Sequence, residues 1–290
     1  MYAFIVNPVS GNGRGKRIWP RIEAELKRKG VAYSVNFTER KGHAMELASG
    51  LVSQPGLRAI VAVGGDGTAH EVVNGLMDKS VPFGYIPSGS GNDFARAEGI
   101  PIDPLKALKR IFLHRPYFID TAEINGQRMI GSLGIGFDGQ VAQAVNHSKW
   151  KAHLGKLSYI WGFSHVLRHF QPQQVSVSID GKTNTYKGVW LIAITNIPNY
   201  GGGMKICPDA RWDDGQLDIC VVHGISRGKL LALFPSVFRG SHIRYSAVTM
   251  KRGKEIHVTS EKPMIVHADG EIIGETPLTI KVSPQSLLII

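Results

Sequence analysis

Apolar and polar residues in the first part of the chain follow two alternating patterns. Short, mainly apolar runs have the composition of buried strands, and the segments between them repeat apolar residues at the spacing of an amphipathic helix. Strands that alternate with helices favour a doubly wound α/β domain built on a parallel sheet. The predicted strands are Tyr2–Asn7, Val31–Phe37, Leu57–Val63 and Phe83–Ile86. The predicted helices are Arg17–Lys29, Gly42–Leu51, Ala69–Met77 and Ile102–Leu113.

Beyond Tyr117 the pattern changes to strands joined by turn signals. Asn125-Gly126 and Asp180-Gly181 are typical of tight hairpin turns, which favours a mainly antiparallel β-sandwich. Helical stretches at about Gln140–Arg168 and Lys229–Arg239 interrupt this part. The predicted strands are Phe118–Ile124, Gln127–Gly136, Gln174–Ile179, Lys187–Thr195, Gln216–His223, Glu255–Ser260, Met264–Ala268 and Thr279–Val282.

The change of pattern predicts two domains. A chain of 290 residues is long enough to give each domain its own core. We expect the first domain over residues 1–121 and the second over residues 122–283. The final apolar run, Leu287–Ile290, is expected to return to the first domain, so that residues 284–290 rejoin it.

Composition places the chain among globular proteins, with 43% hydrophobic and 20% charged residues. No apolar run approaches the roughly 18 residues that cross a bilayer. The start, Met1–Val6, lacks the basic residues of a signal peptide and reads as a strand. Cys207 and Cys220 form no C-x-x-C pair, so we expect two reduced thiols in a cytoplasmic protein.

Charge is the one unusual feature of the composition, because 34 Lys and Arg against 23 Asp and Glu give a net charge of +11. Such a surface attracts nucleic acid, nucleotides or an anionic lipid leaflet. No stacked-aromatic RNA motif or helix-turn-helix pattern is present, so no nucleic-acid partner is expected. Basic and aromatic residues around Lys149-Trp150-Lys151, with Lys156 and Trp161, and the segment Lys229–Arg239 are consistent with peripheral contact with an anionic membrane. They are equally consistent with helices that pack on the sandwich.

The sharpest motif is Gly64-Gly65-Asp66-Gly67-Thr68, between a predicted apolar strand and a predicted helix. Glycines let backbone N–H groups approach an oxyanion, and a helix N-terminus adds partial positive charge, so the place suits phosphate. A tight turn without a ligand is the alternative, but three glycines with an Asp and a Thr exceed what a turn requires.

Standard signatures do not fit this chain. The dinucleotide pattern would need glycine where His70 stands, and the Walker pattern fails because Arg17 follows Gly15-Lys16. Ser88 occupies the first glycine position of a nucleophile elbow, so we reject a hydrolase built on Ser90.

Two more glycine-rich turns, Asn7–Gly13 and Pro87–Asp93, follow the first and fourth predicted strands. In a parallel sheet the carboxyl ends of the strands open on one edge, where ligands bind. Three such loops on one edge predict a phosphate cradle far more strongly than any single loop.

Together with Phe137-Asp138-Gly139, Asp214–Asp218 and Asp269-Gly270-Glu271, these motifs resemble the diacylglycerol kinase catalytic-domain family, which includes soluble bacterial diacylglycerol kinases and sphingosine and ceramide kinases. The resemblance covers essentially the whole chain. It implies an ATP-dependent lipid kinase that phosphorylates the hydroxyl of a diacylglycerol-like lipid at a membrane surface. It also implies Mg²⁺ as a cofactor and ATP as the phosphoryl donor.

The resemblance also implies site residues by position. Ser90 stands where the family often has Thr, and Asp66 is implied near the Mg²⁺ that bridges the phosphates, so it is counted among the catalytic residues. The implied ATP-binding residues are Asn7, Pro8, Val9, Ser10, Gly11, Thr38, Gly64, Gly65, Asp66, Gly67, Thr68, Ala69, His70, Glu71, Ser90 and Asn92.

Asp269 and Glu271 resemble the acidic pair assigned to base catalysis. From the residues alone, His267, Asp269 and Glu271 alternate as on one face of a strand. Alternatively, Asp269-Gly270 is a hairpin turn with solvated acids, followed by a new strand at Ile272-Ile273. Which acid is the base stays open at this point.

A structural Mg²⁺ site is implied by the resemblance at Arg211 and Gln216, through backbone carbonyls, and at the Asp214 carboxylate. Oxygen ligands of these kinds suit Mg²⁺. From the residues alone, a plain turn before the next strand explains the same segment.

Other functions compete with the lipid kinase. NAD kinase shares the Gly-Gly-Asp-Gly motif, although the matches at Ser90–Asp93 and Asp214–Asp218 favour a lipid kinase. A nonenzymatic nucleotide-binding regulator is a further alternative, against which the Asp269 and Glu271 pair argues. Diacylglycerol, a polyprenol, phosphatidylglycerol and a sphingoid base all remain open as the lipid, and so does a homodimer, for which the family offers a precedent.

Overall fold

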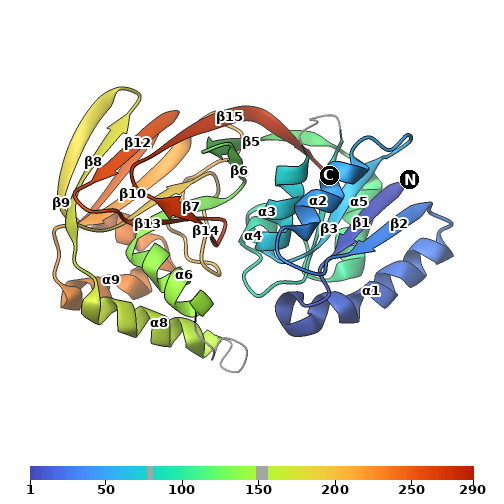
Figure 1. Cartoon of the computed structure of the whole chain (residues 1–290), viewed down its shortest axis with the longest axis horizontal. Helices are drawn as coiled ribbons and strands as arrows, with labels where there is room; N and C mark the ends of the chain where they lie inside the picture. Colours follow the sequence, from blue (N-terminus) through green and yellow to red (C-terminus); the bar gives the residue numbers. More distant parts are fainter. Residues whose placement is uncertain (77–80, 148–155) are drawn as a thin grey trace. The chain divides into compact units, whose positions relative to one another are not determined.

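The computed structural model describes residues 1–76, 81–147 and 156–290. The chain divides into two compact units (Figure 1). Unit 1 comprises Met1–Thr121, Gly201–Gly203 and Ser283–Ile290, and unit 2 comprises Ala122–Tyr200 and Met204–Val282. Apart from the short stretch Gly201–Gly203, the chain passes from unit 1 to unit 2 within strand β5 (Tyr117–Ile124) and returns within strand β15 (Leu278–Ile289).

Unit 1 is built on a parallel sheet in the order β15-β4-β3-β1-β2. Its strands are β1 (Tyr2–Val6), β2 (Tyr33–Phe37), β3 (Ala59–Gly64) and β4 (Phe83–Pro87), and Ile289 of β15 pairs in parallel with Phe83. Every residue of β1, β3 and β4 is buried, as expected for strands covered on both faces. The prediction of a doubly wound α/β layer is confirmed.

Five helices accompany this sheet in the described part of unit 1. Helix α1 buries Ile18, Trp19, Ile22 and Leu26, which share the face that its apolar spacing predicts. Asp103 caps α5 by accepting hydrogen bonds from the N–H groups of Leu105 and Lys106. The helices are α1 (Ser10–Arg28), α2 (His43–Leu51), α3 (Asp66–Gly75), α4 (Asp93–Ala97) and α5 (Pro104–Leu113).

The helix predicted at Ala69–Met77 begins earlier, at Asp66, so the Gly-Gly-Asp-Gly motif itself supplies its first turn. Met77 lies outside the described residues. Helix α4 was not predicted, because five residues are too few for an apolar period and two loop residues, Gly91 and Asn92, precede it.

Unit 2 is a β-sandwich-like domain of mainly antiparallel strands, which confirms the predicted fold class. Its longest strand, β9 (Lys182–Thr195), changes partners along its length. Residues up to Val189 pair with β8, and residues from there to Thr195 pair with β10 and β7. Gly188, with φ of 62°, lies where the partners change.

The other strands of unit 2 are β6 (Gln127–Met129), β7 (Ser132–Gly136), β8 (Gln173–Ile179), β10 (Leu217–His223), β11 (Val248–Gly253), β12 (Glu255–Ser260), β13 (Ile265–Ala268) and β14 (Glu271–Glu275). Its helices are α6 (Phe137–His147), α8 (Lys156–His169), α9 (Arg227–Val237) and the short 3₁₀ helix η1 (Ser241–Arg244). No helix in these described segments, or in those of unit 1, is long and apolar enough to cross a membrane.

Three differences from the predicted strands have physical causes. The run Gln127–Gly136 is split into β6 and β7, because the amides between them bind a side chain rather than a neighbouring strand. The edge strand β11 pairs only with β10 and carries polar residues, so its sequence has no apolar period. The predicted strands Thr279–Val282 and Leu287–Ile290 are parts of one strand, β15.

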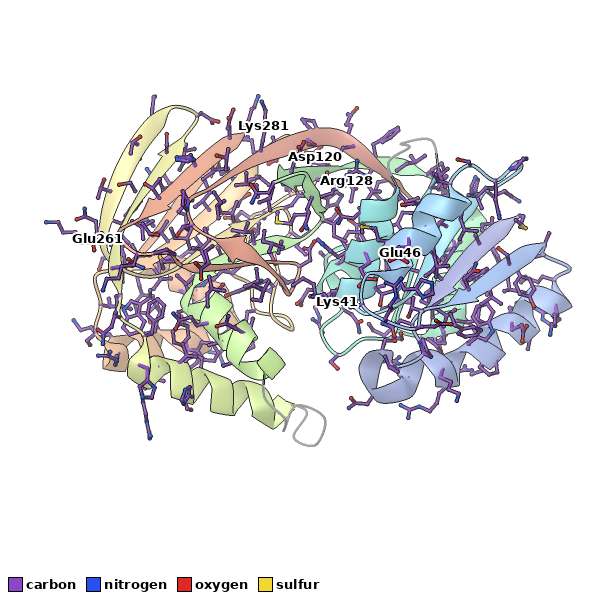
Figure 2. All side chains as sticks on the ribbon, viewed as in Figure 1. Lys41, Glu46, Asp120, Arg128, Glu261 and Lys281 are labelled. Atoms are coloured by element: carbon purple, nitrogen blue, oxygen red, sulfur yellow. The ribbon has the colours of Figure 1, made fainter. Side chains whose placement is uncertain are left out.

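Side chains contact β15 in both units, and two of the residues involved, Asp120 and Lys281, are labelled in Figure 2. In unit 1, the Asp120 carboxylate accepts a hydrogen bond of 2.8 Å from the N–H of Gln285, and Thr121 Oγ1 lies 2.7 Å from Ser286 Oγ. In unit 2, Lys281 Nζ lies 3.7 Å from the carboxylate of Glu255 on β12.

Candidate active site

Three loops meet at the carboxyl edge of the parallel sheet in unit 1. They follow β1, β3 and β4, which are adjacent and parallel, so their ends lie side by side. Asn7 Nδ2 donates to Thr68 Oγ1 over 3.0 Å, and Ser10 Oγ lies 2.6 Å from Ser88 Oγ. The structure therefore brings together the three glycine-rich motifs that the sequence predicts at one edge.

Glycines allow these loops to touch through their backbones. A β-carbon on Gly11 would collide with the carbonyl oxygen of Ser88, and one on Gly65 would lie 3.2 Å from the Cα of Gly89. The first loop extends into the range given for α1, where Gly11, Asn12 and Gly13 interrupt the helix with left-handed backbone, with φ of 54°, 55° and 80°. Because these loops have few side chains where they meet, their backbone N–H groups can reach a ligand, and such groups bind phosphate oxygens.

Asp66 joins the second loop to the third. Its Oδ1 accepts a hydrogen bond of 3.3 Å from the N–H of Phe94, at the start of α4. Burial, and then the negative charge of Asp93, raise the pKa of Asp66 to about 6, against the opposing effect of backbone N–H groups. Asp66 thus positions the third loop, and its pKa lies above that of an ordinary aspartate.

Two of the predicted ATP-binding residues, Glu71 and Thr38, make hydrogen bonds outside the three loops. The carboxylate of Glu71 accepts hydrogen bonds from the N–H groups of Gly42 and Ala44, at 2.8 and 3.1 Å, and so caps the start of α2. Thr38 is buried just after β2, and its N–H donates to the carbonyl of Val6.

The remaining predicted residues differ in exposure. Ala69 and His70 are buried inside α3, and the Asn74 amide contacts His70. Val9 is 76% exposed, and Ser90 is exposed near the tip of the third loop. The open edge thus offers the loop tips and their backbone, while Thr38, Ala69 and His70 are buried within the unit.

The third loop is closed by Asn92, which has φ of 53°. Its side chain accepts from the N–H of Gly89 at 2.9 Å and donates to the carbonyl of Gly89 at 2.8 Å. The hydroxyl of buried Tyr85 donates to the carbonyl of Gly64 at 3.2 Å. Sequence reasoning missed Tyr85 and Ser88; a polar group at the carboxyl end of a buried strand is the signal that would have found both.

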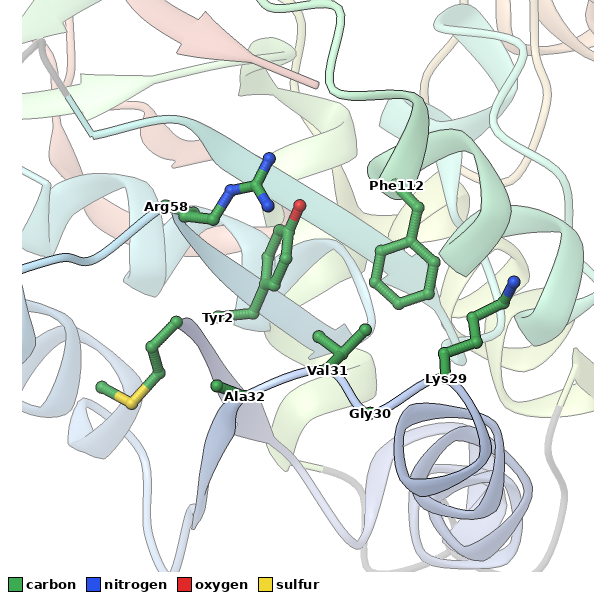
Figure 3. A pocket seen from close by; sticks show the side chains of 8 residues that line it. Tyr2, Lys29, Gly30, Val31, Ala32, Arg58 and Phe112 are labelled. Atoms are coloured by element: carbon green, nitrogen blue, oxygen red, sulfur yellow. The ribbon is translucent and has the colours of Figure 1, made fainter.

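An open cavity of about 530 Å³ in unit 1 lies away from these loops (Figure 3). It is at the amino ends of β1 and β2, where the Arg58 guanidinium sits 5.3 Å from the centroid of the Tyr2 ring. Lys29 and Phe112 also line it. It contains none of the predicted ATP-binding residues.

In unit 2, Asp269-Gly270 forms a two-residue hairpin turn between β13 and β14, with φ of 49° and 88°. The expectation that His267, Asp269 and Glu271 share one strand face is therefore wrong, and the hairpin alternative is correct. However, the Asp269 carboxylate is not simply solvated. It accepts hydrogen bonds from three successive N–H groups, those of Ile130, Gly131 and Ser132, at 3.0, 2.8 and 3.0 Å.

Glu271 is the first residue of β14 and is partly exposed. It pairs across the hairpin with Ala268. The two acids of the motif therefore have different surroundings, one bound to three amides and the other at the start of an edge strand.

The segment 211–216 lies on a loop before β10. Asp214 Oδ1 accepts from the N–H of Gln216 at 3.0 Å, and Arg211 pairs with Asp213 through two hydrogen bonds. Asp214 Oδ2 is 3.9 Å from Arg252 Nη1. In the described ranges, no cluster of three or more His, Cys, Asp or Glu side chains suits a metal, so a cation here would rely on backbone oxygens.

One observation nearby favours a cation. Asp218 is 4% exposed and its Oδ1 pairs with Arg252 Nε at 2.8 Å, whereas its Oδ2 is buried without a hydrogen-bond partner. Burial raises the pKa of Asp218 against the effect of Arg252. A buried oxygen of this kind, beside Asp214, fits the hydration shell of a bound Mg²⁺.

Comparison with known proteins agrees with the fold and the motifs. Residues 1–124 match the diacylglycerol kinase catalytic domain, and residues 131–290 match the YegS C-terminal NAD kinase beta sandwich-like domain. The chain is 33% identical over 294 residues to the diacylglycerol kinase of Mycobacterium tuberculosis (strain ATCC 25618 / H37Rv), covering 99% of this chain and 93% of that one. It is 32% identical over 284 residues to the diacylglycerol kinase of Bacillus subtilis (strain 168), covering 94% and 90%.

A solved structure gives the same result. A crystal structure described as that of a diacylglycerol kinase from Bacillus anthracis str. Sterne superposes with a TM-score of 0.81 at 26% identity, covering 100% of this chain and 96% of that one. The match of both domains and the identity along nearly the whole length show the family. The chain belongs to the diacylglycerol kinase catalytic-domain family and is a lipid kinase of that family.

Proposed function

We propose that this protein transfers the γ-phosphoryl group of ATP to the hydroxyl of a diacylglycerol-like lipid at a membrane surface. Family membership implies ATP and a lipid, and the names of the relatives support diacylglycerol as the acceptor. The observation that carries the proposal is the backbone contact among three glycine-rich loops at one sheet edge. Such a surface binds phosphate through N–H groups.

Each domain takes one role in this proposal. Residues 1–121, with 284–290, form the nucleotide-binding domain, and residues 122–283 form the lipid-substrate domain. The ATP phosphates contact the loop tips of Asn7–Gly11 and of Gly64–Thr68, with the hydroxyl of Ser90 and the loop closed by Asn92. Thr38, Ala69, His70 and Glu71 act by shaping the domain around these loops, Glu71 through the start of α2.

Asp66 has a second role beyond holding α4. Its pKa of about 6 means that it is largely ionised at pH 7, close to the phosphate loops. An ionised carboxylate there would help to hold Mg²⁺ against the phosphate oxygens. When bound, Mg²⁺ would offset the negative charge that develops during transfer.

Of the two acids on the hairpin, we assign the base to Glu271. Three N–H groups occupy the oxygens of Asp269, which suits a residue that holds the turn. Glu271 takes the proton of the lipid hydroxyl as that oxygen bonds to the γ-phosphorus. The bond between the γ-phosphorus and the β–γ bridging oxygen breaks, and ADP leaves with the electron pair.

A second, structural Mg²⁺ is proposed at Asp214, with the backbone carbonyls of Arg211 and Gln216. The buried oxygen of Asp218 supports this placement. Its role would be to hold the loop before β10 in one conformation.

Helix α9 is proposed as the membrane-facing element of unit 2. Leu231, Pro235 and Phe238 follow one helix face and are exposed, Leu231 at 48% and Phe238 at 50%. Residues 219–254 contain no Asp or Glu, so no carboxylate of this segment repels an anionic leaflet. Of the other segment predicted to face the membrane, Lys149-Trp150-Lys151 lies outside the described residues. We propose a cytoplasmic location with peripheral membrane contact.

The decisive experiment is transfer of labelled γ-phosphate from ATP to lipids in mixed micelles: diacylglycerol, undecaprenol, phosphatidylglycerol, sphingosine and ceramide, with NAD as a soluble acceptor. We expect labelled diacylglycerol, lost in Asp66→Ala and strongly reduced in Glu271→Gln, both of which stay folded. Labelled NAD would assign the protein to NAD kinase chemistry instead. Bound ATP without any labelled product would favour a nonenzymatic nucleotide-binding regulator.

A further inference from the structure

A buried polar cluster lies behind the Asp269-Gly270 hairpin in unit 2. Asp138, in the first turn of α6, directs its Oδ2 toward two side chains. The hydroxyl of Tyr200 donates to it at 3.3 Å, and His267 Nε2 lies 3.4 Å from it. The Asp138 Oδ1 accepts from the N–H of Gly139 at 2.9 Å. None of these side chains belongs to the proposed ATP or Mg²⁺ sites.

The cluster is largely shielded from solvent. The side chains of His267 and Asp138 are 7% and 12% exposed, and Tyr200 is buried. The rings of Tyr200 and His267 are parallel, with centroids 6.4 Å apart. Burying a carboxylate lowers the stability of the folded state unless polar groups replace its lost hydration. Moving the polar groups that face Asp138 away from it would therefore destabilise the protein.

Gly134 leaves room for this arrangement. It pairs directly with His267 across β7 and β13, and a β-carbon on it would collide with both Asp138 Oδ2 and His267 Nε2. The contact between β7 and β13 thus places the imidazole against the carboxylate and permits no side chain between them.

His267 also connects the cluster to the chemistry proposed above. It stands on β13, which leads directly into the Asp269-Gly270 turn and then to Glu271 on β14. The hairpin is consequently held at two places: the turn by Asp269, through three backbone N–H groups, and the strand by His267, through Asp138. Among the strands that the structure describes, β14 lies at the end of the sheet and pairs with β13, so whatever holds β13 also helps to hold Glu271.

We propose that His267, Asp138 and Tyr200 are positioning residues that hold the Glu271 carboxylate in place for proton abstraction. The proposal rests on the assignment of Glu271 as the base. It adds to that assignment a buried set of three side chains that never touch the substrate. A displacement of about 1 Å at a reacting group can lower a rate about 100-fold, so the fit of this set governs kcat.

Variants of His267 and of a control histidine distinguish a loss of positioning at Glu271 from a general loss of folding. His267→Leu removes the imidazole nitrogen that lies 3.4 Å from Asp138 Oδ2, whereas His267→Gln keeps a nitrogen that can reach the same carboxylate. The matched control is His242→Leu, because His242 is also buried in unit 2 and its Nε2 lies 3.0 Å from the carbonyl oxygen of Ile206. Each is assayed with dioleoylglycerol in mixed micelles that contain phosphatidylglycerol.

We expect His267→Leu to lower kcat about 100-fold with an unchanged KM for ATP, and His267→Gln to restore most of it. Deuterium exchange of the amides in residues 265–275 should rise in His267→Leu and stay at the wild-type rate in His242→Leu. Unchanged exchange in His267→Leu, or an equal loss of kcat in the His242 control, would overturn the proposal.

A double-mutant cycle with Glu271→Gln tests whether the effect passes through Glu271. We expect His267→Leu to lower kcat no further once Glu271 is changed, because the positioned group is already lost. Losses that multiply would show that His267 acts elsewhere. Full activity of the single variant Glu271→Gln would show that Glu271 is not the base, and the positioning proposal would fail with that assignment. This result is distinct from kcat losses that multiply in the double variant, which would contradict the positioning proposal alone.

Discussion

Gly65 and Gly89 bring two loops of unit 1 into backbone contact, and a β-carbon on Gly89 would lie 2.5 Å from the Cα of Gly65. Gly89→Ala should therefore separate the second and third loops. Overpacking of this kind costs about 1–3 kcal/mol, so we expect the affinity for ATP to fall about 10- to 100-fold. Titration calorimetry with ATP measures the change.

Gly50 offers the matched control for that substitution. It is the second-to-last residue of α2, and a β-carbon there would meet nothing within 4 Å. Gly50→Ala should keep full ATP affinity and stabilise the protein by at most about 0.5–1 kcal/mol, the gain expected in a helix interior. Equal ATP affinity in both variants would show that the contact between the loops is not needed for binding.

Asp66 predicts a pH-dependent stability. Its pKa rises from 3.8 to about 6 on folding, so the folded state binds this proton more tightly than the unfolded state. Asp66 therefore does not lower the free energy of unfolding below pH 3.8. Between pH 3.8 and about pH 6 it lowers that free energy progressively. Relative to the wild type, Asp66→Asn should gain up to about 3 kcal/mol between pH 4 and pH 8, while losing activity.

Urea unfolding at pH 4.5 and pH 7.5 measures this difference. The gain should be clearly larger at pH 7.5, because the wild-type carboxyl group is then ionised in both states. If Asp66→Asn is stabilised by the same amount at both pH values, the pKa of Asp66 is the same in the folded and unfolded states.

Asp269 predicts a loss of both stability and activity. Asp269→Ala leaves the N–H groups of Ile130, Gly131 and Ser132 without their acceptor, which should cost about 3 kcal/mol. It also releases the turn that carries Glu271, so kcat should fall. Thermal unfolding and the lipid assay measure the two effects.

Asp180 is the matched control, since Asp180-Gly181 forms another hairpin turn of unit 2. Its carboxylate accepts from the N–H groups of Lys254 and Glu255 at 3.0 and 2.9 Å. Asp180→Ala should lower stability in the same way and leave kcat unchanged in the folded protein. A parallel loss of kcat in both variants would reduce the role of Asp269 to stability alone.

The proposed structural Mg²⁺ site predicts stabilisation by the ion. Adding MgCl₂ should raise the melting temperature of the wild type, and Asp214→Asn should abolish the increase. Asp213→Asn is the control, because Asp213 is adjacent and pairs with Arg211 instead. An Mg²⁺-dependent increase that persists in Asp214→Asn would place the ion elsewhere.

The exposed face of α9 predicts salt-sensitive binding to vesicles. Phe238→Asp should reduce sedimentation with phosphatidylglycerol vesicles at low salt, because it adds negative charge to an exposed apolar position. Leu113→Asp changes an equally exposed apolar residue of unit 1 and serves as the control. Equal loss in both variants would argue against a specific role of α9.

Much of the fold could be read from local patterns. The buried strands of unit 1 are continuous apolar runs, and the Asp-Gly and Asn-Gly turns of unit 2 occur where the sequence shows them. The grouping of the three glycine-rich loops also followed, because parallel topology places strand ends at one edge. Helix α4 and strand β11 were missed, since neither has an apolar period of its own.

The sequence by itself determined the two fold classes, the loops at the sheet edge and the family resemblance, because each depends on residues close together in the chain or on motifs in order. Only the tertiary structure decided what each carboxylate contacts. Asp269 reaches amides 137 to 139 residues away, Glu71 caps a different helix, and Asp138 meets Tyr200 and His267. Such partners are set by the packing of strands distant in the sequence, which no local pattern encodes.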